Sequence, residues 1–137
     1  MMPPSLDRID HVHVYVKDRA AAARWYAEVM GMKPIEEFLT WAEGDGPLTL
    51  ANAANTVRIA LFEHPARARH ATVALGVGAR EFVAWKAHLA HAFGAPVELE
   101  DHDLSWSLYF SDPDGNPYEI TTYEYREAAA LLRSPAG

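Results

Sequence analysis

Cysteine is absent from this chain of 137 residues. Disulfide bonds, thiolate nucleophiles and cysteine-based zinc sites are therefore excluded. Positive charge is also scarce, because 12 lysines and arginines stand against 19 aspartates and glutamates, a formal net charge of −7. A chain without a basic stripe does not neutralise phosphates, so we expect no nucleic-acid partner and no binding to anionic membranes.

Long apolar runs are absent as well. No stretch approaches the roughly 20 apolar residues that a membrane-spanning helix needs. The first five residues, MMPPS, lack the charged and apolar segments of a signal peptide, so we expect a cytoplasmic protein. Half of the residues are hydrophobic, and the length suits one domain with a substantial core.

Two parts of the sequence repeat the same order of predicted elements. Each begins with a strand of alternating apolar residues, 9–16 or 70–77, and continues with a helix that ends at Gly31 or Gly94. Asp18 is the expected N-cap of the first helix. Helices are predicted over 19–30, 80–93 and 126–133, and further extended segments over 33–41, 48–51, 56–62, 96–100, 105–110 and 117–123.

This order predicts an α+β fold of two βαβββ modules, about 7–63 and 69–123, within a single domain spanning 1–137. Two such modules form a curved eight-stranded sheet, a cup with its helices on the convex side. The apolar residues of each strand face the helices and the alternate residues line the concave face. The concave set comprises His11, His13, Tyr15, Arg58, Ala60, Phe62, His70, Thr72, Ser105, Ser107, Tyr109, Glu119, Thr121 and Tyr123. A structural sheet with one solvated polar face has the same alternation, so that interpretation stays open.

Several short motifs carry a family resemblance. They are Asp10-His11 followed by Val16-Lys17-Asp18, Trp25-Tyr26 with Met30-Gly31, and Asp112-Pro113-Asp114-Gly115-Asn116 followed by Glu119. With them the chain resembles, over nearly its whole length, the vicinal oxygen chelate superfamily. That superfamily includes glyoxalase I, fosfomycin and bleomycin resistance proteins, and extradiol dioxygenases. The resemblance implies that His11 and Glu119 are metal ligands.

The second module departs from the family pattern. Thr72 stands where the resemblance places another ligand histidine, and His70 lies two residues earlier on the same face. Two residues span about 6.6 Å along a strand, so His70 serves as the remaining ligand only with a shifted register or a bulge. His13, two residues from His11, forms an alternative pair. Ala60 matches the position of an additional glyoxalase I ligand, which counts against that activity.

A second signature favours the extradiol dioxygenases. Their spacing of histidine, tyrosine, acidic residue, proline, glycine and glutamate is similar to that of His102, Tyr109, Asp112, Pro113, Gly115 and Glu119. The resemblance implies a metal-dependent enzyme acting on a catechol-like or other vicinal-oxygen small molecule, with Fe(II) or Mn(II) as cofactor.

In that interpretation His102 and Tyr109 are catalytic, His102 as a proton shuttle and Tyr109 as a hydrogen-bonding group for the substrate. Arg58, His13 and Thr121 contact the substrate, and a guanidinium pairs well with a substrate carboxylate. Plainer interpretations exist as well. His102 is then a solvent-exposed loop residue, Tyr109 a half-buried aromatic of the sheet, and Arg58 a surface charge.

Two other functions remain open. One is a metal-free, ligand-sequestering protein of the bleomycin-resistance type, which Thr72 supports, and the other is a fosfomycin-type thiol transferase. All three imply a small-molecule partner. The alanine-rich start of the first helix, 20–23, allows close helix packing, so we expect a homodimer.

Overall fold

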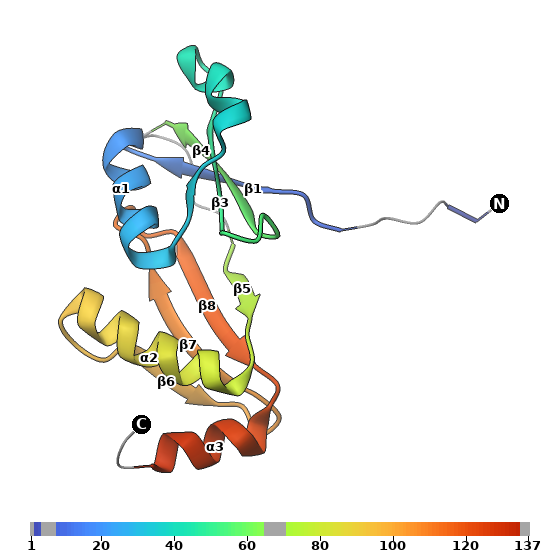
Figure 1. Ribbon diagram of the computed structural model, residues 1–137, viewed down its shortest axis with the longest axis vertical. Coiled ribbons are helices and arrows are strands. Elements are labelled where there is room, and N and C mark those ends of the chain that lie inside the picture. The colour runs from blue at the N-terminus through green and yellow to red at the C-terminus, as the bar shows by residue number, and fades with distance from the viewer. Residues whose placement is uncertain (1, 4–7, 65–70, 135–137) are drawn as a thin grey trace. The chain divides into compact units, whose positions relative to one another are not determined.

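The computed structural model describes residues 2–3, 8–64 and 71–134. The chain divides into two compact units, unit 1 (Met1–Ala68) and unit 2 (Arg69–Gly137). Figure 1 draws unit 1 from blue to green and unit 2 from yellow-green to red. The elements in chain order are β1 (Val12–Val16), α1 (Arg19–Met30), β2 (Lys33–Pro34), η1 (Glu36–Glu43), β3 (Leu48–Ala51), β4 (Arg58–Glu63), β5 (Val73–Gly76), α2 (Ala79–Phe93), β6 (Glu98–Asp101), β7 (Trp106–Ser111), β8 (Pro117–Thr122) and α3 (Tyr125–Arg133).

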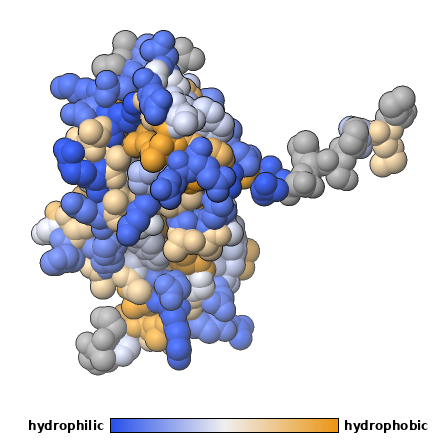
Figure 2. All heavy atoms as spheres, turned by 45° about the horizontal axis from the view of Figure 1, so that its top comes forward, coloured by the Kyte–Doolittle hydropathy of each residue, from blue (hydrophilic) through white to orange (hydrophobic). Residues whose placement is uncertain are grey.

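The predicted α+β class and its two βαβββ modules are confirmed. Unit 1 holds a four-stranded sheet in the order β1-β4-β3-β2, and unit 2 holds one in the order β5-β8-β7-β6. In each sheet the first and last strands of the module run parallel and the remaining pairs are antiparallel. Within residues 2–3, 8–64 and 71–134, no helix combines the length and apolarity needed to cross a membrane. Hydrophilic side chains cover much of the face seen in Figure 2, with smaller apolar patches between them.

Helix α1 begins and ends where the sequence predicts. The Asp18 carboxylate accepts a hydrogen bond from the backbone N–H of Ala21 at 3.0 Å, which satisfies one free donor at the N-terminus. Gly31 closes the helix with a φ of 66°, a left-handed conformation that glycine adopts without steric cost. The helix covers the apolar face of its sheet, and the core of unit 1 contains Val14, Val16, Tyr26, Leu50 and Leu61.

The prediction of an extended segment over 33–41 is wrong for most of its length. Only Lys33–Pro34 is a strand, and η1 is a 3₁₀ helix. Phe38 and Trp41 stack with ring centroids 4.4 Å apart, as residues three apart do in this helix type. The Arg19 guanidinium donates to the carbonyl oxygens of Ala42 at 2.6 Å and Gly46 at 2.7 Å, which ties the segment to α1.

Glu124, at the start of α3, links the two helices of unit 2. Gly78 offers no side chain to cap α2, and Glu124 Oε1 instead accepts the N–H of Ala79 at 2.7 Å. Helix α3 is held to the sheet by Trp106, whose ring stacks on Tyr125 and whose indole N–H donates to the Tyr125 carbonyl at 3.2 Å. The core of this unit contains Phe82, Leu89, Leu108, Tyr118 and Ile120.

The turn at residues 112–116 sets the register of the last hairpin. The Asp112 carboxylate accepts the backbone N–H groups of Asp114 and Asn116 and the side-chain amide of Asn116, at 2.8–2.9 Å. Gly115 has a φ of 85°, which again suits glycine. Because this turn is closed by short bonds, Tyr109 on β7 lies directly opposite Glu119 on β8.

Candidate functional site

Two imidazoles lie side by side at the start of the first sheet. Nε2 of His11 is 3.1 Å from Nε2 of His13, and the ring centroids are 5.0 Å apart. Behind them, Nδ1 of His11 lies 2.9 Å from Oδ2 of Asp10. A carboxylate only accepts hydrogen bonds, so Nδ1 carries the proton and, in neutral His11, Nε2 has a free lone pair. The hydrogen bond from His11, supported by the charge of Arg58, lowers the pKa of the Asp10 carboxyl from 3.8.

Aromatic rings continue this face of unit 1. The ring of Phe62 on β4 lies 4.8 Å from that of His13 and 5.7 Å from that of Tyr15, measured between centroids. Arg58 lies on the same strand, with Nε donating to Oδ1 of Asn55 at 2.9 Å and its guanidinium carbon 5.7 Å from the Phe38 centroid. The predicted use of Arg58 for a substrate carboxylate stays a prediction.

The carboxylate of unit 2 sits among hydroxyl groups. The Ser107 hydroxyl donates to Oε2 of Glu119 at 2.7 Å and lies 3.2 Å from Oγ1 of Thr121. Thr121 itself donates to the Trp106 carbonyl at 3.2 Å and is buried, so its hydroxyl belongs to the interior of the sheet. Its predicted contact with a substrate stays a prediction.

The predicted catalytic pair is in direct contact. Nε2 of His102 lies 2.8 Å from the hydroxyl oxygen of Tyr109, although seven residues separate them. Desolvation, and to a smaller extent the neighbouring Glu119 charge, raises the pKa of Tyr109 from 10.0, against a lowering hydrogen bond with Ser107. The phenol therefore stays protonated at neutral pH, and it lies between a histidine and a carboxylate.

The strand registers show that the two units carry complementary donors. Val12 pairs with Ile59 in unit 1, as Val73 pairs with Tyr118 in unit 2. At the next residue of each strand, His13 lies opposite Ala60 in unit 1, whereas the equivalent Ala74 lies opposite Glu119 in unit 2. One step back, His11 corresponds to Thr72. At these matched positions, unit 1 therefore has His13 opposite Ala60, and unit 2 has Ala74 opposite Glu119.

The donors match a divalent metal in chemical type. His11 has a carboxylate behind its far nitrogen, the arrangement that orients metal-binding histidines. The part of the chain that the structure describes contains no group of three or more histidine, aspartate or glutamate side chains that holds a metal by itself. The predicted ligand His70 lies outside the described residues. Sequence reasoning missed Asp10 and Ser107 as supporting groups, although Asp10 directly precedes a candidate ligand.

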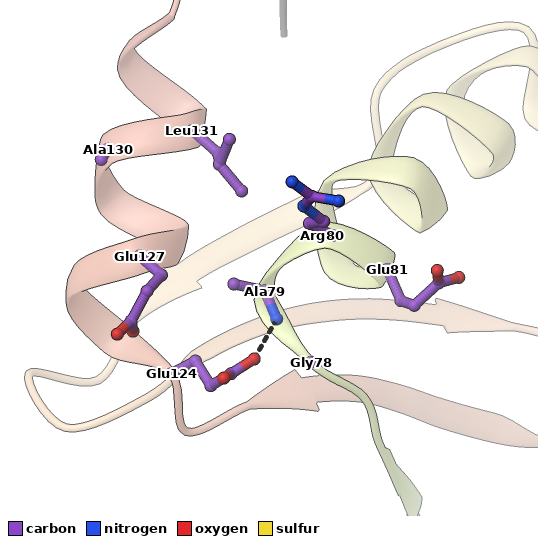
Figure 3. A pocket seen from close by; sticks show the side chains of 8 residues that line it. All are labelled: Gly78, Ala79, Arg80, Glu81, Glu124, Glu127, Ala130 and Leu131. Carbon is purple, nitrogen blue, oxygen red and sulfur yellow. Dashed lines mark hydrogen bonds between the residues drawn. The ribbon is translucent and has the colours of Figure 1, made fainter.

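A separate hollow of about 500 Å³ opens between α2 and α3 in unit 2. Figure 3 shows Glu124 at its base, bonded to the Ala79 N–H, and Arg80 and Leu131 projecting from the two helices. None of its lining residues was predicted as a site residue. The hollow is thus distinct from the candidate groups on the sheet.

Comparison with known families decides the membership of this chain. The model of the Glyoxalase/Bleomycin resistance protein/Dioxygenase superfamily matches residues 8–120. The chain belongs to this superfamily. The resemblance to vicinal oxygen chelate proteins is thereby confirmed. A search of curated proteins finds no match.

Solved structures of superfamily type share the fold. A putative glyoxalase family protein from Bacillus anthracis is 23% identical, with a TM-score of 0.67 and coverage of 89% of this chain and 99% of that one. A glyoxalase/dioxygenase from Nostoc punctiforme is 17% identical, with a TM-score of 0.66 and coverage of 90% and 95%. The oxidase ChaP-H1 is 25% identical, with a TM-score of 0.62 and coverage of 85% and 96%. The superfamily joins glyoxalases, resistance proteins and dioxygenases, so membership alone leaves the reaction open.

Proposed function

We propose that this superfamily member is a metal-dependent enzyme of the dioxygenase type that acts on a catechol-like small molecule. The observation that carries the proposal is the position of Tyr109. Its phenol is 2.8 Å from His102, and Tyr109 lies directly opposite Glu119. Three groups that can bind a substrate with acidic hydroxyl groups therefore share one face of the sheet. The similarity to the oxidase ChaP-H1 supports the same class.

In this proposal His11 and Glu119 are ligands of Fe(II) or Mn(II). When bound, such an ion supplies Lewis acidity and the redox chemistry that oxygen activation requires. The supporting contacts fit this use, because Asp10 orients the ring of His11 and Ser107 holds one oxygen of Glu119. Outer contacts of this kind fix ligand orientation in metal sites.

The chain's own residues handle protons and position the substrate. Tyr109, kept protonated by its raised pKa, donates a hydrogen bond to a substrate oxygen. His102, in contact with Tyr109, takes up and returns the proton of a substrate hydroxyl. Arg58 pairs with a substrate carboxylate, and Thr121 contributes to the lining.

Metal analysis combined with oxygen uptake tests the proposal. Purified protein should retain a divalent transition metal and consume oxygen with catechols, whereas His11→Ala and Glu119→Ala should lose the metal. His91→Ala, on the exposed end of α2, is the matched histidine control and should behave as wild type. Tyr109→Phe should keep the metal while kcat falls by about 10²–10⁴, as expected when a proton-handling group is removed. Near-zero metal in every protein would sink the enzymatic proposal.

A metal-free binding protein of the bleomycin-resistance type is the second candidate. Three positions favour it because they carry no metal-binding side chain where the other unit carries one. They are Thr72, equivalent to His11, Ala74, equivalent to His13, and Ala60, equivalent to Glu119. Calorimetry with a catechol in excess chelator separates the two functions. Binding that chelator leaves unchanged, without oxygen uptake, would establish the sequestering function instead.

We also propose a cytoplasmic homodimer. Ala20 and Ala21 lie exposed on α1, and small side chains permit close packing between helices. Sedimentation equilibrium should give about twice the chain mass of 15.2 kDa. Bulky substitutions such as Ala20→Arg should shift the protein to monomers, and a monomeric wild type would contradict this proposal.

A further inference from the structure

We propose that His13 supplies the second imidazole ligand of the metal, in place of the one that Thr72 lacks. The inference rests on the proposed metal dependence and adds a ligand to it. It assigns both imidazoles to β1 and its first flanking residue, at successive positions on one strand face. The sequence pattern placed His13 among the substrate contacts and also allowed it as the partner of His11 in an alternative pair.

The distance between the two rings supports a shared ion. Consider two nitrogens that each lie about 2.1 Å from the same ion. They are about 3.0 Å apart if the nitrogen–metal–nitrogen angle is a right angle, and about 3.4 Å apart if it is tetrahedral. The observed Nε2–Nε2 distance is 3.1 Å, within that range. Residues two apart on a strand point to the same side, so the pair needs no bulge or shift of register.

Contacts around the pair hold both rings in place. Asp10 accepts a hydrogen bond from Nδ1–H of His11, and this leaves the lone pair of neutral His11 on Nε2, 3.1 Å from Nε2 of His13. The Phe62 ring packs 4.8 Å from the His13 ring and limits its rotation. Nη1 of Arg58 lies 3.8 Å from the other oxygen of Asp10 and so helps to hold that carboxylate in position. The pair is therefore preorganised before an ion arrives.

The register explains why unit 1 supplies both imidazoles. The position equivalent to His11 is Thr72, and the position equivalent to His13 is Ala74, which lies opposite Glu119. Neither residue binds a transition metal as an imidazole does. In this proposal His13 supplies the imidazole that position 72 does not. A simple hydrogen bond between two imidazoles is the competing explanation for the short distance.

Metal binding to the stripped full-length protein distinguishes the two explanations. We would titrate Co(II) into wild type, His13→Ala and His70→Ala, following the visible absorption and the heat of binding. Removing His13 should weaken the affinity at least as much as the roughly 10–100-fold that loss of an outer contact costs. His70→Ala should leave it unchanged. Unchanged affinity in His13→Ala, or loss of affinity only in His70→Ala, would overturn the inference.

Two further measurements separate ligation from a structural role. In proton NMR of the Co(II) protein, wild type should show two strongly shifted, exchangeable imidazole N–H signals and His13→Ala only one. Adding Thr72→His to His13→Ala should restore the affinity, because it returns an imidazole to the family position. Failure of the proposed metal dependence would give a different result from failure of this inference. In that case wild type would not bind Co(II), and neither would His11→Ala or Glu119→Ala.

Discussion

The Ser107 hydroxyl donates a hydrogen bond of 2.7 Å to Oε2 of Glu119 across the β7–β8 pair. Ser107 is fully buried, whereas Glu119 is partly exposed. A buried hydroxyl therefore orients a partly exposed carboxylate on the same face of the sheet. The hydrogen bond limits the orientations open to the proposed ligand Glu119.

We predict that Ser107→Ala weakens Co(II) binding by about 10–100-fold, the usual cost of losing an outer contact to a ligand. The substitution removes one oxygen and leaves the backbone ladder intact, so the fold should persist by circular dichroism. Ser111→Ala, at the exposed end of β7, is the matched control and should bind as wild type. Equal affinities in all three proteins would show that Ser107 only fills space.

Asp112→Ala should lower the free energy of unfolding by about 2–4 kcal/mol, because three hydrogen-bond donors lose a buried charged acceptor. Urea unfolding followed by tryptophan fluorescence measures the change. Glu98→Ala removes an exposed carboxylate from β6 and should change the free energy by less than about 0.5 kcal/mol. A loss in Asp112→Ala no larger than this control would contradict the turn's structural role.

Glu124→Ala should cost about 0.5–2 kcal/mol of unfolding free energy, the usual value of a lost N-cap. The glutamate accepts the first N–H of α2 and places a negative charge at the positive end of that helix. Glu124→Gln keeps an acceptor without the charge and should fall between alanine and wild type. Glu127→Ala, in the same hollow (Figure 3), is the comparison. Losses of equal size at 124 and 127 would argue against specific capping.

Alkaline titration should show a tyrosine with a raised pKa that belongs to Tyr125. Its hydroxyl donates to Asp101 at 2.8 Å, and this hydrogen bond is the main cause of a pKa raised from 10.0. A pKa raised on folding stabilises the protein below the unfolded-state value, and that contribution is lost as pH rises through the folded-state value.

Asp101→Asn should therefore lower the pKa of Tyr125 toward 10.0, and Tyr125→Phe should remove one tyrosine's contribution from the high-pH part of the ultraviolet absorbance curve, where Tyr109 also titrates. The direction of the change is decisive, because the Asp101 carboxylate opposes ionisation of Tyr125 both by accepting a hydrogen bond from the protonated phenol and by its negative charge. A higher pKa in Asp101→Asn would refute this account of the contact.

Local chemistry was enough to place most elements. Helix α1 has its capping aspartate and terminal glycine within the sequence itself, and both act at short range. Alternation placed His11 and His13 on one strand face, and the turn motif placed Tyr109 near Glu119. The spacing of a known signature picked out His102 and Tyr109 as candidates, but only the structure shows that the two side chains lie 2.8 Å apart.

Other features depend on residues far apart in the chain. The 3₁₀ segment η1 is tied down by Arg19, 23 and 27 residues from its two acceptors, so its local pattern read as extended. The cap of α2 comes from Glu124, 45 residues from its donor. Asp10 meets Arg58 only because β1 pairs with β4.

Residue type and spacing thus settled the fold class, the helix ends and the identity of candidate donors, because those follow from backbone preferences over a few residues. The contact of Ser107 with Glu119, the approach of Arg58 to Asp10 and the equivalence of Ala60 with Glu119 came from strand register. Register is set when distant strands pair and bury their apolar faces together, and a shift of one residue would reverse every side chain.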